Sequence, residues 1–363
     1  MPARFMRNRT FFSFRIANAA ASCKGFLPPL FFYRFWKYTV LMQRDEIWDE
    51  LNETKRRAVP AWLVRLLVFA LLLLTAGLLA YYYLTGGDAA PPAPSKAPPI
   101  ATPIPGANGE PALLDAYFID VGNGDCFFAR AADGKTMLVD AGSENDADEI
   151  VALLESLEVS RIDALFVSLP DARHIGGMAK IVETFAVGAC YMTKECAASP
   201  LSEPLRSALA TQDVEITEVM ASFTSVIDWA ENVELRILSP HDVGYESEED
   251  RSLMLRIAYG DSRILLAGDA HKLAERMTVK ALPNRLLHAD VLKVGDHGDS
   301  SATSDKFLSA VKPKIAVISC GGKKLPDDTV LARLEARGIM LLRTDTLGTI
   351  HITLDGASAQ VVQ

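Results

Sequence analysis

Residues 66–84 form a run of nineteen residues without a charge, which is long enough to cross the hydrocarbon layer of a membrane as a helix. A basic cluster at residues 55–57 and Arg65 precede this run. Because positive residues stay on the cytoplasmic side, the sequence predicts a single-pass anchor in the cell membrane, with a cytoplasmic N-terminus and an extracytoplasmic C-terminal part. A signal sequence is the alternative, but the run is long for a signal core, and Tyr81, Tyr82 and Tyr83 make a poor cleavage site.

The segments on either side of the run differ in composition. Residues 1–65 are predicted to be a cytoplasmic N-terminal segment, of which the first forty-one hold seven basic residues and no acidic residue. We expect Met42 to be the native start, so that residues 1–41 are not native; a basic segment at the membrane surface is the alternative. Residues 85–112 are rich in Pro, Ala and Gly, which is typical of a semi-extended linker.

Charge is distributed unevenly along the chain. Up to Leu84 there are twelve Lys and Arg against five acidic residues, whereas from Thr85 onward there are twenty-five against forty-one. A domain with a balance of −16 repels polyanions, and contacts from Lys and Arg to phosphates supply most non-specific nucleic-acid affinity. Strong nucleic-acid binding is therefore disfavoured.

The five cysteines are too few for a disulfide scaffold. Cys190 and Cys196 have a spacing that allows a disulfide in an exported domain. The simpler alternative is that Cys126, Cys190, Cys196 and Cys320 are small buried thiols, since free Cys is among the residues most often buried.

From residue 113 to residue 356 the pattern changes to short β-rich runs that alternate with helices. Strand patterns cover LLDAYFIDV, CFFARA and TMLVDAG, and a helical pattern follows in DADEIVALLESL. The same order returns later, with strands in VELRILSP, SLMLRIAY and RILLAGD before the helix LAERMTVKAL. Strand runs followed by a helix in two successive halves predict an α/β domain of two sheets packed between helical layers.

Several blocks of this domain resemble one known family. FIDVGNGDCFFARAADGKTMLVDAGS is similar to the opening of the metallo-β-lactamase-fold domain of ComEC-type DNA-internalisation competence proteins, and SLPDARHIGGM is similar to its S-H-x-D-x-D-H-I-G-G metal motif. SLMLRIAYGDSRILLAGD, ADVLKVGDHGDS and RTDTLGTIHITLDG resemble later blocks of that family, in the same order. The resemblance implies an αββα sandwich over residues 113–356, preceded by one transmembrane helix.

The two-metal chemistry of this family requires His and Asp ligands that converge from different loops. The resemblance places remnant metal-ligand positions at Asp171, His174, Asp269 and His297. Three other positions have lost their ligand, since the family's first His, its second Asp and the first His of its H-H-G-S block are here Leu169, Arg173 and Asp296. A dinuclear site of the family type is therefore not expected.

Two interpretations of the remaining cluster stay open. The four remnant residues can hold one Zn or Mn ion, or they form a metal-free polar cluster in which Arg173 neutralises the acids. An Arg inside a cation site opposes metal binding at close range, so the sequence favours the cluster without a cofactor. Asp120 and Asp125 fit an ordinary tight turn. The remaining histidines of the domain are expected to be surface or strand-end residues: His241, His271, His288 and His351.

The resemblance thus implies a membrane-anchored ComEC-like protein with lost or reduced metal-dependent hydrolysis and a binding or accessory role. The alternative is an active metallohydrolase with an altered site that acts on phosphodiester or other ester bonds. The sequence assigns no catalytic residue and does not decide whether the protein is an enzyme. The membrane is the expected partner, while the ligand or protein partner is not identified by the sequence.

Overall fold

The computed structural model describes residues 70, 102–106, 110–321 and 325–362 of the chain. The predicted N-terminal segment, the predicted membrane-spanning run except Ala70, and most of the predicted linker lie outside these residues. Within the described part of the chain, no helix combines the length and the apolar composition that are needed to cross a membrane.

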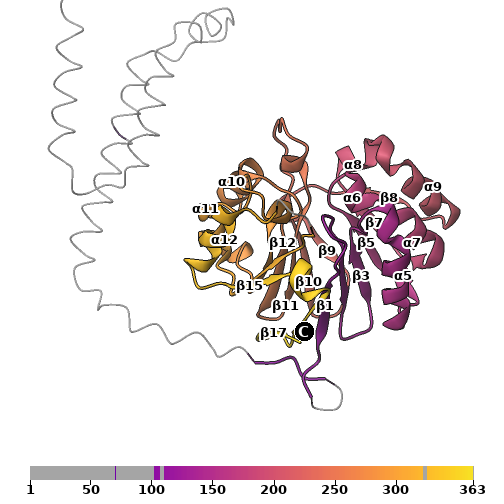
Figure 1. Cartoon of the computed structure of the whole chain (residues 1–363), viewed down its shortest axis with the longest axis horizontal. Coiled ribbons are helices and arrows are strands. Elements are labelled where there is room, and N and C mark those ends of the chain that lie inside the picture. Colours follow the sequence, from indigo (N-terminus) through magenta and orange to yellow (C-terminus); the bar gives the residue numbers. More distant parts are fainter. Residues whose placement is uncertain (1–69, 71–101, 107–109, 322–324, 363) are drawn as a thin grey trace, which may run out of the picture. The chain divides into compact units, whose positions relative to one another are not determined.

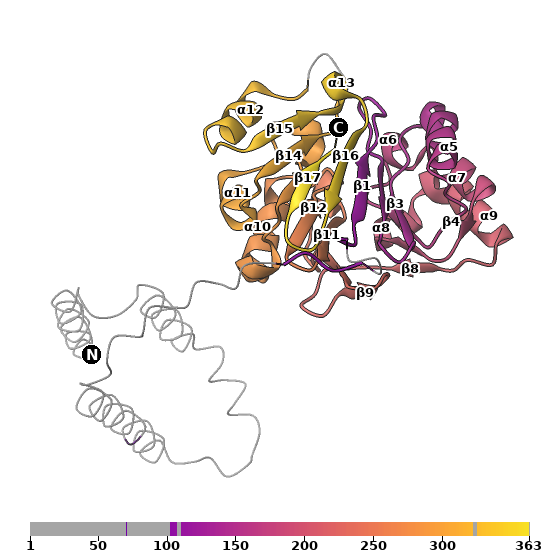
Figure 2. The same ribbon diagram turned by 90° about the horizontal axis from the view of Figure 1, so that it is seen from below.

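An eight-stranded sheet forms one of the two central layers (Figures 1 and 2). Its strands run antiparallel from β17 to β3 and parallel from β3 to β8. In spatial order they are β17 (Ala359–Val361), β16 (Ile350–Leu354), β1 (Leu114–Phe118), β2 (Phe127–Arg130), β3 (Thr136–Val139), β5 (Ala164–Val167), β7 (Cys190–Met192) and β8 (Ile216–Glu218).

A seven-stranded sheet forms the other central layer. Its strands are parallel from β15 to β12 and antiparallel from β12 to β9. In spatial order they are β15 (Met340–Arg343), β14 (Ile315–Ile318), β13 (Val291–Lys293), β12 (Ser262–Leu266), β11 (Met254–Tyr259), β10 (Val233–Ser239) and β9 (Val226–Asp228). A separate short pair joins β4 (Arg161–Ile162) to β6 (Ala186–Val187).

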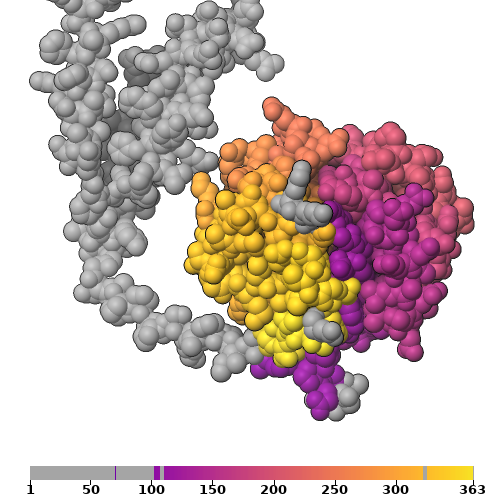
Figure 3. Space-filling view, viewed as in Figure 1, coloured from indigo at the N-terminus to yellow at the C-terminus, as the bar shows by residue number. Residues whose placement is uncertain are grey.

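Helices cover the outer face of each sheet (Figure 1). The first sheet carries α5 (Ala147–Ser156), α6 (Ala172–Ile175), α7 (Met178–Thr184), α8 (Lys194–Ala198) and α9 (Glu203–Thr211), and the second carries α10 (Lys272–Ala281), α11 (Asp305–Val311) and α12 (Asp328–Glu335). The last helix, α13 (Thr344–Leu347), precedes β16, and short 3-10 turns are η1 (Glu144–Asp146), η2 (Pro200–Ser202), η3 (Glu249–Arg251), η4 (Asn284–Leu286) and η5 (Gly295–Gly298). The space-filling view shows the two halves of the described domain side by side, the first in indigo to magenta and the second in orange to yellow (Figure 3).

The alternation of apolar and polar residues explains how the two sheets pack. In β1 the side chains of Leu114, Ala116 and Phe118 are buried, and they join a core cluster with Leu255 and Ile257 of β11 between the sheets. Two further clusters lie between each sheet and its helices. The predicted α/β arrangement, two sheets between helical layers, is therefore confirmed.

The described end of the linker lies against the domain. The backbone N–H of Ile104 donates to the carbonyl of Asp355 at 2.7 Å, and the N–H of Ala112 donates to the carbonyl of Ile104 at 2.8 Å. The Ile104 side chain packs against the core cluster between the sheets. Four cysteines of the described region are buried free thiols: Cys126, Cys190, Cys196 and Cys320.

Candidate metal centre

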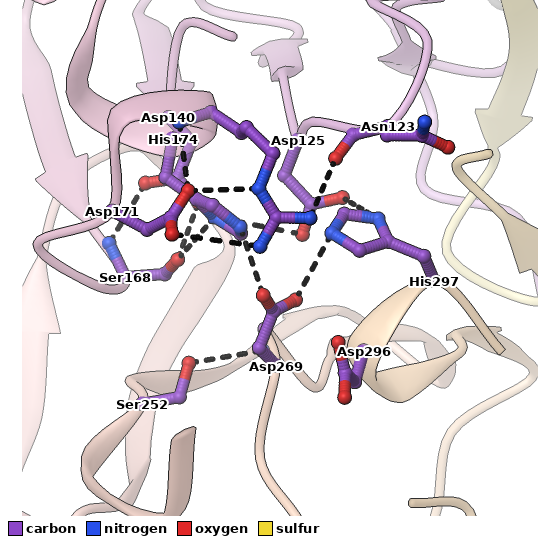
Figure 4. Close-up of polar contacts among 12 residues, drawn as sticks. Asn123, Asp125, Asp140, Ser168, Asp171, His174, Ser252, Asp269, Asp296 and His297 are labelled. Atoms are coloured by element: carbon purple, nitrogen blue, oxygen red, sulfur yellow. Dashed lines mark hydrogen bonds and ion pairs between the residues drawn. The ribbon is translucent and has the colours of Figure 1, made fainter. Parts of the chain in front are cut away.

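A cluster of buried ionisable side chains lies where loops from the two sheets meet (Figure 4). Asp125 precedes β2, Asp140 follows β3, and His174 lies on α6, so these three come from the first sheet and its helices. Asp269 follows β12, Lys293 ends β13 and His297 lies in η5, so the other three come from the second sheet. The carboxyl ends of neighbouring parallel strands meet at one edge of a sheet, which is where ligands of α/β proteins commonly bind.

His174 is fully buried and is held by two neighbours on one side of its ring. Its Nδ1 lies 3.1 Å from Asp140 Oδ2 and 3.2 Å from Ser168 Oγ, and the N–H of Ser168 donates to Asp140 Oδ1 at 2.8 Å. An ionised carboxylate only accepts hydrogen bonds, so we assign the Nδ1 hydrogen to the bond with Asp140. The other ring nitrogen, Nε2, then faces Asp269 Oδ2 at 3.0 Å.

His297 is oriented in the same manner. Its Nδ1 donates to the carbonyl oxygen of Ser319 at 3.0 Å, because a carbonyl can only accept. Its Nε2 faces Asp269 Oδ1 at 3.5 Å. Figure 4 shows the two imidazoles pointing at the Asp269 carboxylate from different sides. The backbone N–H of Asp269 donates to Ser252 Oγ at 3.0 Å, which fixes the loop that carries this carboxylate.

Five buried atoms of the cluster have no hydrogen bond within the described region: His174 Nε2, His297 Nε2, Asp125 Oδ1 and both carboxylate oxygens of Asp269. A histidine that binds a metal ordinarily donates its second ring N–H to a carboxylate or a backbone carbonyl, as both histidines do here. Two imidazole nitrogens and one carboxylate form a ligand set that suits a divalent ion such as Zn²⁺. The donor atoms of His174, Asp269 and His297 therefore fit one metal ion.

The raised pKa of His174 shows that the surrounding carboxylates favour a positive charge at this point. Burial by itself lowers the pKa of the imidazole, but the charges of Asp269 and Asp140 raise it well above its usual value. Burial raises the pKa of Asp269, yet His174 and His297 hold it well below its usual value. In the absence of an ion, a proton on His174 satisfies one oxygen of Asp269, while the other oxygen lies 3.5 Å from His297 Nε2.

Lys293 supplies the buried cation of the cluster. Its Nζ donates to Asp125 Oδ2 and to the carbonyl of Gly268, the latter at 3.1 Å, and lies 3.9 Å from Asp269 Oδ1. Burial lowers the pKa of Lys293, but Asp125 and Asp269 outweigh this effect and raise it. Asp125, which the sequence assigned to a simple turn, is thus part of the cluster. Sequence reasoning did not select Lys293, although a charge inside the apolar run ADVLKVG was an available signal.

Asp171 and Arg173 lie outside this group, at its rim. Asp171 is the N-cap of α6 and accepts the N–H of Arg173 at 2.8 Å. Its carboxylate also pairs with Arg173 Nε at 2.9 Å, and the two side chains are 36% and 45% exposed, respectively. Arg173 therefore pairs with Asp171, as the metal-free interpretation requires, but its guanidinium is partly exposed and is not buried among the other acids. Lys293 has that role instead.

Three of the four remnant residues, His174, Asp269 and His297, thus lie together, while Asp171 pairs with Arg173. Leu169, at the family's first His position, is buried and apolar. Asp296, at another altered position, pairs with His271 Nε2 at 2.8 Å. A second group of possible donors, Asp125, Asp140 and His174, shares His174 with the first group, and its Asp125 is already paired with Lys293.

A centre of this kind, built from His and Asp on loops between two facing sheets, defines the metallo-β-lactamase class of proteins. The chain belongs to the metallo-β-lactamase superfamily, whose family model matches residues 119–323, more than half of the chain.

Among known proteins the chain is similar to ComE operon protein 3 of Bacillus subtilis (strain 168), with 29% identity over 253 residues that cover 64% of this chain and 32% of that protein. It is also similar to competence protein ComA of Neisseria gonorrhoeae, with 30% identity over 247 residues, 66% of this chain and 33% of that protein. The chain thus matches about a third of the length of these relatives. The resemblance to ComEC-type competence proteins is confirmed.

Solved structures with a similar fold include Zn²⁺-bound PqqB from Methylobacterium extorquens, with a TM-score of 0.45 and 13% identity over 67% of this chain and 99% of that one. The metallo-β-lactamase-fold protein YhfI from Bacillus subtilis gives a TM-score of 0.44 and 12% identity, over 64% of this chain and 95% of that one.

Proposed function

We propose that this chain is a membrane-anchored, ComEC-like protein that has lost or reduced two-metal hydrolysis and has a binding or accessory role outside the cytoplasm. The observation that carries the proposal is the ion pair of Asp171 with Arg173, which occupies two ligand positions of the family's metal motif. Hydrolysis by two metals needs a second ion to polarise the scissile bond or to activate water. A guanidinium is always charged and cannot bind a cation, so it cannot replace that ligand.

The second part of the proposal is that one ion, Zn or Mn, binds at His174, Asp269 and His297. The unpaired buried atoms of these residues support this alternative over the metal-free cluster that the sequence favours. When bound, such an ion would supply Lewis-acid chemistry, and His174, Asp269 and His297 would hold it. Asp140 and the Ser319 carbonyl orient the rings of His174 and His297, while Lys293 balances the charge of Asp125.

The second candidate function is a mononuclear hydrolase that acts on phosphodiester or other ester bonds. Catalytic zinc sites commonly have three protein ligands, and His174, Asp269 and His297 offer three donor atoms within 4.8 Å of one another. The names of the relatives, which refer to competence, make a role in competence part of the proposal. DNA as a tightly held ligand is disfavoured by the acidic charge of the domain.

Metal content and turnover of the purified full chain separate these possibilities. We expect at most one Zn or Mn per chain by mass spectrometry, and hydrolysis of bis(p-nitrophenyl) phosphate that does not exceed background when Mn²⁺ or Zn²⁺ is added. Turnover with one ion per chain that a chelator abolishes would select the mononuclear hydrolase. Two ions per chain with such turnover would refute the proposal.

A further inference from the structure

Two loops meet beside the proposed ion, one at residues 268–271 after β12 and the other at residues 295–298 after β13. The first loop carries Asp269 and the second carries His297 (Figure 4). The N–H of Asp296 donates to the carbonyl of Gly268 at 3.1 Å, and His271 Nε2 lies 2.8 Å from Asp296 Oδ2. The two loops are therefore joined at the residues that flank both ligands.

The second loop has an unfavourable backbone. Asp296 has φ 44° and ψ 53°, and His297 has φ 50° and ψ 22°, so two consecutive residues with side chains are in the left-handed region. L-residues visit this region as single residues and seldom in succession, because Cβ approaches the backbone carbonyl. Such a conformation persists where the surrounding structure holds it in place.

We propose that His271 is a positioning residue, which holds Asp296 and thereby fixes His297 as a metal ligand. The side chains of His271 and Asp296 are 24% and 18% exposed, so their bond is shielded from water for most of its surface. Ser301 Oγ lies 3.5 Å from the same Asp296 oxygen, and the N–H of Lys272 donates to the carbonyl of Ser301 at 2.9 Å. These contacts tie Asp296, and Ser301 just beyond the second loop, to the start of α10.

Asp296, one of the altered positions of the family's metal motifs, has a structural role in this arrangement. Asp296 replaces the first His of the H-H-G-S block, and its carboxylate accepts from an imidazole that belongs to the other loop. The contact places no atom of His271 on the proposed ion. Its effect on metal binding passes through the backbone at Asp296 and His297, and from there to the distance between His297 Nε2 and Asp269.

The chain offers a matched control for this pair. His351 on β16 and Asp115 on β1 form the same type of contact at 2.8 Å, with side chains 21% and 34% exposed. His351 also stacks on Tyr117, with ring centroids 4.2 Å apart, so its removal also costs stability. These residues lie in strands far from the proposed ion ligands in the sequence. A general loss of stability would therefore affect both variants, while a positioning role affects His271 alone.

The inference rests on the proposed single-ion site and is tested on the purified full chain with Co²⁺ as the probe. His271→Ala is expected to weaken Co²⁺ binding about tenfold and to change the visible absorption spectrum of the bound ion, as loss of outer-shell partners does in other metal sites. His351→Ala should keep the wild-type affinity and spectrum. His271→Gln should restore both, because its amide N–H can donate to Asp296.

Hydrogen exchange of the metal-free full chain is a second test of the contact between His271 and Asp296. Amides of residues 295–299 should exchange faster in His271→Ala and at the wild-type rate in His351→Ala. Tight Co²⁺ binding by the unaltered protein, with the same affinity and spectrum in His271→Ala, would overturn the positioning role alone. A lack of Co²⁺ binding by the unaltered protein would overturn the single-ion proposal, and with it the role of His271 in metal binding.

Discussion

Lys293 Nζ donates a hydrogen bond to Asp125 Oδ2 across the interior, and so links β13 of one sheet to the loop before β2 of the other. Both side chains are more than nine-tenths buried. Their charges cancel where water cannot reach them, and burial of either charge without the other is costly. The pair therefore belongs both to the candidate site and to the stability of the sandwich.

Lys293→Met should destabilise the domain by about 3–5 kcal/mol, because it leaves Asp125 as a buried charge without its cation. Chemical unfolding of the purified full chain measures the change. Lys180→Met is the control, since Lys180 lies 3.7 Å from Asp148 and the two side chains are 52% and 89% exposed, so its loss should cost about 0–1 kcal/mol. Equal losses in the two variants would contradict the structural role of Lys293.

Arg173→Ala should cost less than about 1 kcal/mol, because its pair with Asp171 is partly exposed and screened by water. The same unfolding measurement applies. A loss above about 3 kcal/mol would show that Arg173 compensates buried charge after all.

Restoring the family's ligands should restore the second ion site. The combined change Leu169→His, Arg173→Asp and Asp296→His is expected to raise the metal content from at most one ion toward two ions per chain. The variant with Leu169→His and Asp296→His alone keeps the guanidinium and should remain at one ion or fewer. Mass spectrometry of both variants after loading with Zn²⁺ decides the matter, and an unchanged count in the triple variant would argue against the assigned ligand positions.

The stability of the domain should fall in mild acid partly because of His241. Burial lowers the pKa of this imidazole below its usual value, and its Nε2 lies 3.2 Å from Thr278 Oγ1. The folded state thus binds the proton more weakly than the unfolded state. The contribution of His241 to the free energy of unfolding is therefore complete above a pH of about 6.5 and is lost as the pH falls through the lowered pKa. Unfolding curves of wild type and His241→Gln between pH 8 and pH 5 should diverge below this value. Parallel curves would exclude His241 as a source of the pH dependence.

The predicted topology can be tested on intact cells. The basic cluster at residues 55–57 predicts that the chain before residue 66 is cytoplasmic and that the domain from residue 113 onward is outside. A protease added to cells or spheroplasts should digest the domain and spare the N-terminal segment. Protection of the domain would refute the assignment.

Much of the fold could be predicted because its strands and helices carry clear patterns. The helix predicted in DADEIVALLESL is α5, and LLDAYFIDV contains β1, whose side chains alternate between buried and half-buried. The strands β7, β8 and β9 were not predicted, since each has three residues and so shows no period. The helix α9 was missed as well, although Ser202 and Pro204 at its start are common in the first turn of helices.

Some residues of the candidate site could likewise be predicted from the sequence, and others could not. His174, Asp269 and His297 could be located because each lies in a block that resembles a metal motif of the ComEC-type family. Asp125 and Lys293 could not be paired, since 168 positions separate them and the contact depends on how the two sheets pack. The exposure of Arg173 could not be predicted from the sequence either. It accompanies the capping of α6 by Asp171, which places the side chains of Asp171 and Arg173 at the rim.

The attachment of Ile104 to Asp355 has a consequence for access to the site. The N–H of Asp261, next to the first residue of β12, donates to the carbonyl of Gly356, so the described linker end meets the domain near the beginning of that strand. Asp269 follows the opposite end of β12. The described linker end and the candidate site therefore lie at opposite ends of β12, and the attachment of residues 102–106 leaves the partly exposed rim residues Asp171 and Arg173 accessible to a ligand.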